Sequence, residues 1–289
     1  MASSCKLFGI DRQVYYRRIK RKAKCSAQAA EVISLVRDVR LRMPRLGTRK
    51  LYHILKAPLD RLAIGRDKLF GILRANHMMI APKRNYRVTT NTYHRFYKHK
   101  DIVSRLTVTR PEQVWVADIT YVGNRAANTY LALITDAYSK KIVGYDLSDS
   151  LSVDGSMRAL KMALGNRAYP REALIHHSDK GIQYCCDRYQ ERLAKGNVKC
   201  SMTEGYDPYS NAVAERVNGI IKQEFGLESF NEPIGIMKKI VAQSISVYNE
   251  ERPHLSCYML TPNKMHRQRT IRIKTYKSKT GSRFEPASG

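Results

Sequence analysis

The chain has 289 residues, 43% of them hydrophobic, and its 52 Lys and Arg against 25 Asp and Glu give a formal net charge of +27. This length predicts one sizeable domain and a smaller one. The sequence contains no apolar stretch long enough to span a bilayer and does not begin like a secretory signal, which argues against a membrane or exported protein. We therefore expect a soluble, cytoplasmic protein. A charge this positive indicates a polyanionic partner.

The positive charge is concentrated at the two ends of the chain. Residues 1–100 hold 25 basic and 5 acidic side chains, residues 101–263 hold 19 of each, and residues 264–289 hold 8 and 1. A ribosomal or other basic protein can have a similar total, but a neutral centre between basic ends favours DNA-binding segments attached to a catalytic domain. The six cysteines form no CxxC pair, so we expect free thiols and no structural zinc site.

The first 80 residues are expected to be helical. Leu7 to Ile19 suggest a short helix, a turn and a basic second helix, and a further helix begins near Ser26 and stops at Met43 and Pro44. Two more short helices follow, in RKLYHILK after a cap at Gly47 and Thr48, and in IGRDKLFGILRANHM. Short basic helices of this kind resemble a helix-turn-helix, and the alternative is a solvated basic bundle. The candidate DNA contacts are Arg49, Lys50, Arg66 and Lys68.

Residues 81–110 are basic and rich in tyrosine, which predicts a linker that follows phosphates. Beyond Gln113 the pattern changes to β-strands. VWVADITYV predicts one strand, and YLALITDAYSKKIVGYDL predicts two more in an antiparallel arrangement. A helix at 153–164, the strand ALIHHSD, a helix at 184–194 and the strand VKCSMT follow, with further helices at 211–225 and 234–249. The series indicates a mixed α/β sheet.

Three carboxylates stand out in this region. Asp118 interrupts an apolar strand, where desolvating a carboxylate is unfavourable unless a cation or hydrogen bonds compensate. Asp179 ends a strand just before a Lys-Gly pair. Glu215 lies on a predicted helix whose polar face also carries Asn211, Asn218 and Lys222, because these positions follow one another at helical spacing. Taken singly, each residue has an ordinary explanation as a turn or surface residue.

Together, the three carboxylates predict a site for divalent metal ions. Paired Mg²⁺ ions prefer hard oxygen ligands and can activate a nucleophile and stabilise a leaving oxygen during displacement at phosphorus. Lys222 is expected to hold a phosphate near those ions.

The segments WVADITYV, HHSDKGIQY and YSNAVAERVNGIIKQEF closely resemble the three carboxylate motifs of the DDE transposases of insertion sequences, relatives of retroviral integrases. The best match is the second-frame product of insertion-sequence family three. Thirty-five residues lie between Asp179 and Glu215, and Lys222 follows Glu215 by seven, as in that family. The resemblance continues through MPRLGTRKLYHIL upstream and YNEERPHLSCYMLTP downstream. Ser210 replaces the Asp that many relatives carry before Asn211, and we expect little effect.

The resemblance implies a ribonuclease-H-like mixed sheet with flanking helices, preceded by the small helical region. We assign residues 1–80 to a helical DNA-binding region, 81–110 to a linker, 111–262 to the integrase-like catalytic core and 263–289 to a basic tail. Asp118, Asp179 and Glu215 would bind two Mg²⁺ or Mn²⁺ ions. The partners would be the element's terminal repeats and target DNA, bound by a homo-multimer associated with the nucleoid, with an upstream-frame protein as fusion or partner.

The functional hypothesis is therefore a transposase that cleaves and joins DNA at its own element's ends. The alternatives are a catalytically silent DNA-binding protein and a nuclease of the same fold. His177, beside the second motif, is a candidate for steering a phosphate or proton, although a histidine there is more often packed. Asn211 is expected to contact DNA or shape the cleft.

Overall fold

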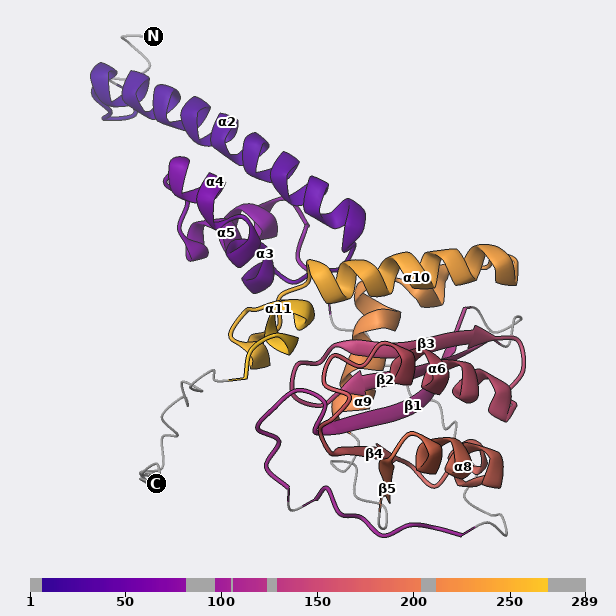
Figure 1. Ribbon diagram of the computed structural model, residues 1–289. Coiled ribbons are helices and arrows are strands. Elements are labelled where there is room, and N and C mark those ends of the chain that lie inside the picture. The colour runs from indigo at the N-terminus through magenta and orange to yellow at the C-terminus, as the bar shows by residue number, and fades with distance from the viewer. Residues whose placement is uncertain (1–6, 82–96, 105, 124–128, 204–211, 270–289) are drawn as a thin grey trace, which may run out of the picture.

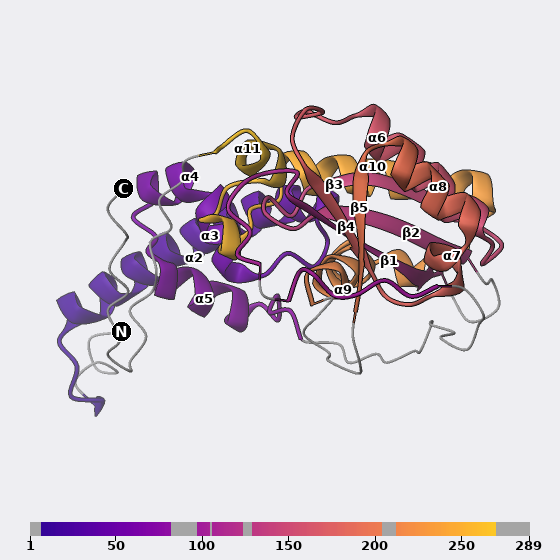
Figure 2. The same ribbon diagram turned by 60° about the horizontal axis from the view of Figure 1, so that its bottom comes forward.

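A computed structural model describes residues 7–81, 97–104, 106–123, 129–203 and 212–269 (Figure 1). The helical region expected in the first 80 residues is present. Its helices are α2 (Arg12–Arg42), α3 (Thr48–Ile54), α4 (Lys56–Arg61) and α5 (Arg66–Ala75). The N-terminal end of α2 extends past the other three helices in both views (Figures 1 and 2).

Helix α2 corrects the prediction of separate helices before and after Ser26. It is continuous over 31 residues, because no glycine or proline interrupts it between the cap at Asp11 and Arg42. The Asp11 carboxylate accepts a hydrogen bond from the Gln13 amide at 2.6 Å. Thr48 was also wrongly predicted to share a cap: Gly47 occupies the N-cap of α3 and Thr48 is the first helical residue.

The central element of the core is a five-stranded sheet in the order β3-β2-β1-β4-β5. The antiparallel pairs join β1 to β2 and β2 to β3, whereas β4 pairs in parallel with both β1 and β5. The mixed sheet predicted from the sequence is confirmed. The strands are β1 (Val114–Val122), β2 (Thr129–Asp136), β3 (Ile142–Ser148), β4 (Leu174–Ser178) and β5 (Val198–Met202).

Helices cover both faces of the sheet. One face packs against α6 (Val153–Gly165), α7 (Ile182–Cys185) and α8 (Asp187–Lys195), and the other against α9 (Ala212–Gly219) and α10 (Ile234–Glu250). Side chains alternate along β1, so Trp115, Ala117 and Ile119 join the first core and Val122 joins the second. Helix α6 approaches β3 so closely that a Cβ at Gly144 would lie 2.2 Å from the Ala159 carbonyl oxygen.

Two of the predicted helices are divided. The helix expected at 184–194 is split at Cys186, whose backbone is extended (φ −66°, ψ 147°). The helix expected at 211–225 is α-helical only to Gly219 and continues as a π-helix, η1 (Ile220–Glu224). This wider turn begins directly after glycine, the weakest helix former of the segment. Short 3₁₀ helices η2 (Leu227–Ser229) and η3 (Leu255–Cys257) and helix α11 (Pro262–His266) complete the described chain.

The helical region docks on the core through the segment after α9. One hydrophobic cluster contains residues from α2, α3 and α5 together with residues from η1 and α10. At the other end, His266 of α11 is buried against the core, so packing continues beyond the boundary predicted at residue 262. Across the residues described, none of the helices combines the length and apolar character that crossing a membrane requires.

Candidate active site

Strand β1 places Asp118 at the centre of the sheet. Its side chain lies on the same face as Val122, which packs against α9 and η1. The carboxylate is partly buried and has two hydrogen bonds: Oδ1 accepts from the Ile119 amide at 2.9 Å, and Oδ2 accepts from Asn218 Nδ2 at 2.6 Å. Two donors therefore hold this carboxylate in place, one on the strand itself and one on helix α9.

The parallel pairing of β1 with β4 brings Asp179 beside Asp118. Val116 is level with His177 in the register, and each aspartate follows its pairing residue by two positions. Side chains alternate with a period of two and paired strands lie about 4.8 Å apart. We therefore expect both carboxylates on the same face of the sheet and close together, with Asp118 on β1 and Asp179 just after β4. Asp179 begins a tight turn in which its Oδ1 accepts a hydrogen bond from the Gly181 amide at 3.0 Å.

The turn leaves little room for a side chain at Gly181. A Cβ at position 181 would lie 3.0 Å from Asp179 Oδ1 and 3.2 Å from Gln183 Oε1. A larger residue would therefore require the ends of these two side chains to shift by a few tenths of an ångström.

The third carboxylate, Glu215, lies in the first turn of α9 with its side chain exposed. Burial, together with the negative charges of Asp179 and Glu215, raises the pKa of Asp118 to about 7, against the hydrogen bonds from Ile119 and Asn218. Asp179 and Glu215 thus repel the charge of Asp118, and a bound cation would relieve this repulsion. Within the described ranges, however, no group of three His, Cys, Asp or Glu side chains is close enough to hold one metal ion.

Lys222 lies on the same side of the sheet as Asp118. Its Nζ donates to Thr120 Oγ1 at 3.3 Å, and Thr120 follows Asp118 by two positions on β1. The structure thus brings this lysine to the face of the sheet that carries the first carboxylate, although the π-helix changes the helical register assumed from the sequence.

Asn218 is a functional candidate that sequence reasoning did not single out. It is 5% exposed, and among the described residues its Oδ1 is buried without a hydrogen-bond partner while its Nδ2 holds Asp118. The signal was available, because Asn218 lies one turn after Glu215 on the predicted polar face. What the sequence could not provide was the contact with a strand one hundred positions earlier in the chain.

Comparisons with known proteins identify the family. Residues 108–208 and 196–262 match two family models, both described as an integrase core domain. A protein of Shigella sonnei, named "Insertion element IS600 uncharacterized 31 kDa protein", is 31% identical over 266 residues, covering 89% of this chain and 95% of the relative. The chain belongs to the insertion-sequence transposases. The transposase is also 33% identical over 153 residues to "Transposase InsF for insertion sequence IS3A" of Escherichia coli K12, and this match covers 53% of each chain.

Two solved structures are distant likenesses of the transposase. One is the HTLV-2 integrase catalytic core domain in complex with magnesium, at 18% identity and a TM-score of 0.44, covering 54% of this chain and 97% of that one. The other is the simian T-cell lymphotropic virus intasome in complex with PP2A regulatory subunit B56 gamma, at 16% identity and a TM-score of 0.49, covering 82% of this chain and 81% of that one. Likenesses of this size do not bear on residue roles.

The structure corrects the role predicted for His177. This side chain is fully buried in β4, and its Nδ1 is 2.9 Å from Ser201 Oγ on β5. A histidine without exposed surface does not contact DNA in this conformation. Its neighbour His176 is equally buried and is 2.9 Å from the Tyr189 hydroxyl. Both histidines of the second motif therefore belong to the interior of the transposase.

The other predicted DNA contacts divide into three groups. Lys50 is mostly buried and forms an ion pair with Glu224, which corrects its assignment to DNA. Arg49, Arg66 and Lys68 are exposed on the helical region and stay candidates. Asn211 lies outside the described residues.

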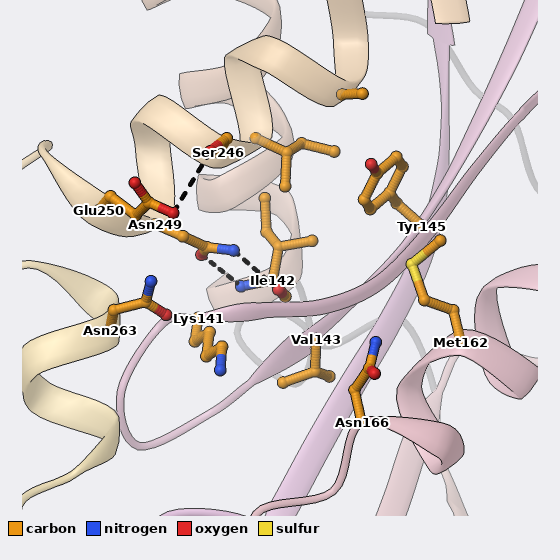
Figure 3. Close-up of a pocket in the computed structure, with 12 residues that line it drawn as sticks. Lys141, Ile142, Val143, Tyr145, Met162, Asn166, Ser246, Asn249, Glu250 and Asn263 are labelled. Carbon is orange, nitrogen blue, oxygen red and sulfur yellow. Dashed lines mark hydrogen bonds between the residues drawn. The ribbon is translucent and has the colours of Figure 1, made fainter. Parts of the chain in front are cut away.

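A separate cavity of about 320 Å³ lies away from the carboxylates. It is bounded by β3, α6 and α10, and Asn249 points to the edge of β3, where it accepts from the Ile142 amide at 3.0 Å and donates to the Ile142 carbonyl at 2.9 Å (Figure 3). This pair of bonds satisfies backbone groups at a strand edge, a structural role for the helix that lines the cavity.

Proposed function

We propose that the transposase cleaves and joins DNA at the ends of its own insertion sequence, and that Asp118, Asp179 and Glu215 hold the divalent ions that this chemistry uses. The observation that supports the proposal is the register of β1 and β4, in which Val116 pairs with His177, two positions before Asp118 and Asp179 respectively. The raised pKa of Asp118, caused by burial and by the other two carboxylates, supports it.

The donor set fits Mg²⁺ or Mn²⁺, since all three side chains offer hard oxygen ligands. When bound, two such ions would supply the charge that activates a water or a DNA 3′-hydroxyl and stabilises the leaving oxygen. Among the described residues the carboxylates are not gathered into a ready metal site, so completing the set requires them to move closer together. Asn218 fixes the orientation of Asp118 before any ion arrives, because its amide holds one carboxylate oxygen.

Lys222 is proposed to hold a DNA phosphate at this site. Its ammonium lies beside Thr120, on the strand that carries Asp118, and a phosphate is a strong acceptor for a charged ammonium. A phosphate bound there would lie next to the carboxylates. Lys222 would thus orient the strand to be cut without contributing to metal binding.

The partners of the transposase are proposed to be its element's terminal repeats and target DNA. Joining two ends in one reaction requires both ends in one assembly, which favours a homo-multimer. An upstream-frame protein, as fusion or partner, is a further prediction that co-expression tests.

The proposal is tested with purified protein and a duplex that ends in the element's terminal repeat. Replacing each of the three carboxylates by its amide should abolish Mn²⁺ binding measured by calorimetry and, in parallel, strand nicking and joining. Asp149→Asn is the matched control, because Asp149 is an exposed core carboxylate outside the site. Nicking that survives all three substitutions would contradict the proposal, and a preference for RNA·DNA hybrids would indicate a nuclease.

A further inference from the structure

The first half of helix α2 has no packing partner in the described structure. None of the side chains from Arg12 to Ala27 is buried, whereas Val32, Val36 and Val39 in the second half pack into the hydrophobic core. We call residues 12–27 the arm. At about 1.5 Å per residue, the arm is about 24 Å long. In Figures 1 and 2 the end of α2 that contains it extends beyond α3, α4 and α5.

The arm carries cations where the rest of the helix carries its packing residues. It has seven basic side chains and no acidic one. Helical spacing aligns Arg17, Arg21 and Lys24 with Gln28, and the same line continues to the buried Val32. The three cations are exposed. The side of α2 that binds protein in its second half therefore offers a row of positive charges in its first half.

Contacts at Gln28 connect this row to the helical region. Gln28 Nε2 donates to the Leu62 carbonyl at 3.1 Å, and Gln28 Oε1 accepts from Lys68 Nζ at 3.2 Å. The row of cations therefore points to the side on which α4 and α5 lie, and it continues onto α5 through the exposed Lys68. The arm and α5 together border one basic surface.

We propose that the arm binds the phosphates of a DNA duplex, with Arg17, Arg21 and Lys24 as its contacts; this rests on the proposed function in that DNA is the substrate. The major groove, about 12 Å wide, admits an α-helix. A second copy of the chain is a poorer occupant, because two arms with seven positive charges each would repel. Of the exposed apolar side chains, Ile19, 45% exposed, lies on the opposite side from the row, and Tyr16, 42% exposed, lies at its flank.

The test is a comparison of two triple variants of the full chain, without metal, binding a fluorescent duplex at a series of salt concentrations. The arm variant is Arg17→Gln, Arg21→Gln and Lys24→Gln, which retains helix propensity. The control variant, Lys161→Gln, Arg171→Gln and Lys195→Gln, removes the same charge from exposed positions of the core. Each phosphate contact contributes about 0.9 to the slope of log affinity against log salt.

We expect the arm variant to lose about 2.7 units of slope and at least about tenfold in affinity at 0.1 M salt, and the control to change little. Equal losses in both variants, or none in the arm variant, would overturn the proposal. A change in oligomeric state of the arm variant without DNA, measured by sedimentation, would assign the arm to a second copy instead. A native chain with no salt-dependent DNA binding would refute the proposed function itself, whereas a steep native slope unaffected by the arm variant refutes only the arm.

Discussion

Glu224 joins three parts of the transposase, and replacing it is expected to destabilise the fold more than replacing its partner Lys50. Its carboxylate accepts two bonds of 2.8 Å from Arg252, which is 1% exposed, and lies 3.0 Å from Lys50 of α3. Its carbonyl accepts from the Arg45 amide at 2.9 Å. The residue ends η1, directly after the segment that carries Lys222. The helical region is thus attached to the helix of the candidate site.

The size of the effect follows from which charge is left unpaired. Glu224→Gln keeps the shape but leaves Arg252 buried without a counter-charge, and breaking a buried pair in this way costs about 3–5 kcal/mol. Since Glu224 is 17% exposed and glutamine still offers one acceptor, we expect about 2–4 kcal/mol. For a chain of this size that lowers the melting temperature by about 3–7 °C.

Lys50→Met should have a smaller effect, below about 1 kcal/mol, because Arg252 still neutralises Glu224. The directions in which the pKa values of Lys50 and Glu224 shift agree with this ranking. Burial and the nearby Arg252 lower the pKa of Lys50 despite Glu224, so its charge gains little from the site. Burial opposes the charge of Glu224 as well, yet the bonds from Arg252 and Lys50 outweigh it and lower the pKa of that carboxyl.

The assay is thermal unfolding of the two variants, Glu224→Gln and Lys50→Met, with Arg42→Met as the matched control. Arg42 and Glu251 form the other described ion pair between the helical region and the core, and they are 56% and 32% exposed. Such a pair contributes less than about 1 kcal/mol. If Glu224→Gln melts within the error of Arg42→Met, or if Lys50→Met is as damaging as Glu224→Gln, the reasoning is wrong.

Three further predictions concern single side chains. Asn218→Ala should lower strand joining about 10- to 100-fold with unchanged melting, because Asp118 loses the group that orients it; equal joining would remove Asn218 from the site. Lys222→Ala should weaken joining more than it weakens Mn²⁺ binding, and equal losses in both would contradict its phosphate role. Burial lowers the pKa of His266, but its bonds to Asp136 and Glu112 raise it overall above 6.5. The stability from His266 is therefore present below about pH 6.5 and lost as pH rises through the folded pKa, so His266→Gln should lower the melting temperature more at about pH 6 than at about pH 9.

Much of the core could be predicted because its signals are local. The apolar, β-prone run of β1 set its position, and the interruption of that run at Asp118 marked a charge that the fold has to accommodate. Chain order and strand pattern were enough to predict a mixed sheet, which then places the two aspartates side by side.

The remaining features depend on contacts between residues that are distant in the chain. The sequence around Lys50 predicts a surface cation on a basic helix, because its partner Glu224 lies 174 positions later. His177 lies two residues before Asp179 and was therefore predicted as a site residue. The pairing of β4 between β1 and β5 buries it instead. The role of Asn218 likewise depends on the distance between α9 and β1, which a single sequence does not contain.

The most direct test of the central claim is excision of the element in cells, measured as circle junctions formed from a plasmid that carries the element's ends. The native chain is compared with Asp118→Asn and Glu215→Gln, each with and without the upstream frame. We predict junctions with the native chain and none with either variant, and a requirement for the upstream frame would show that this chain is one part of the active enzyme. Junctions that persist with either substituted carboxylate would contradict the assignment of the active site.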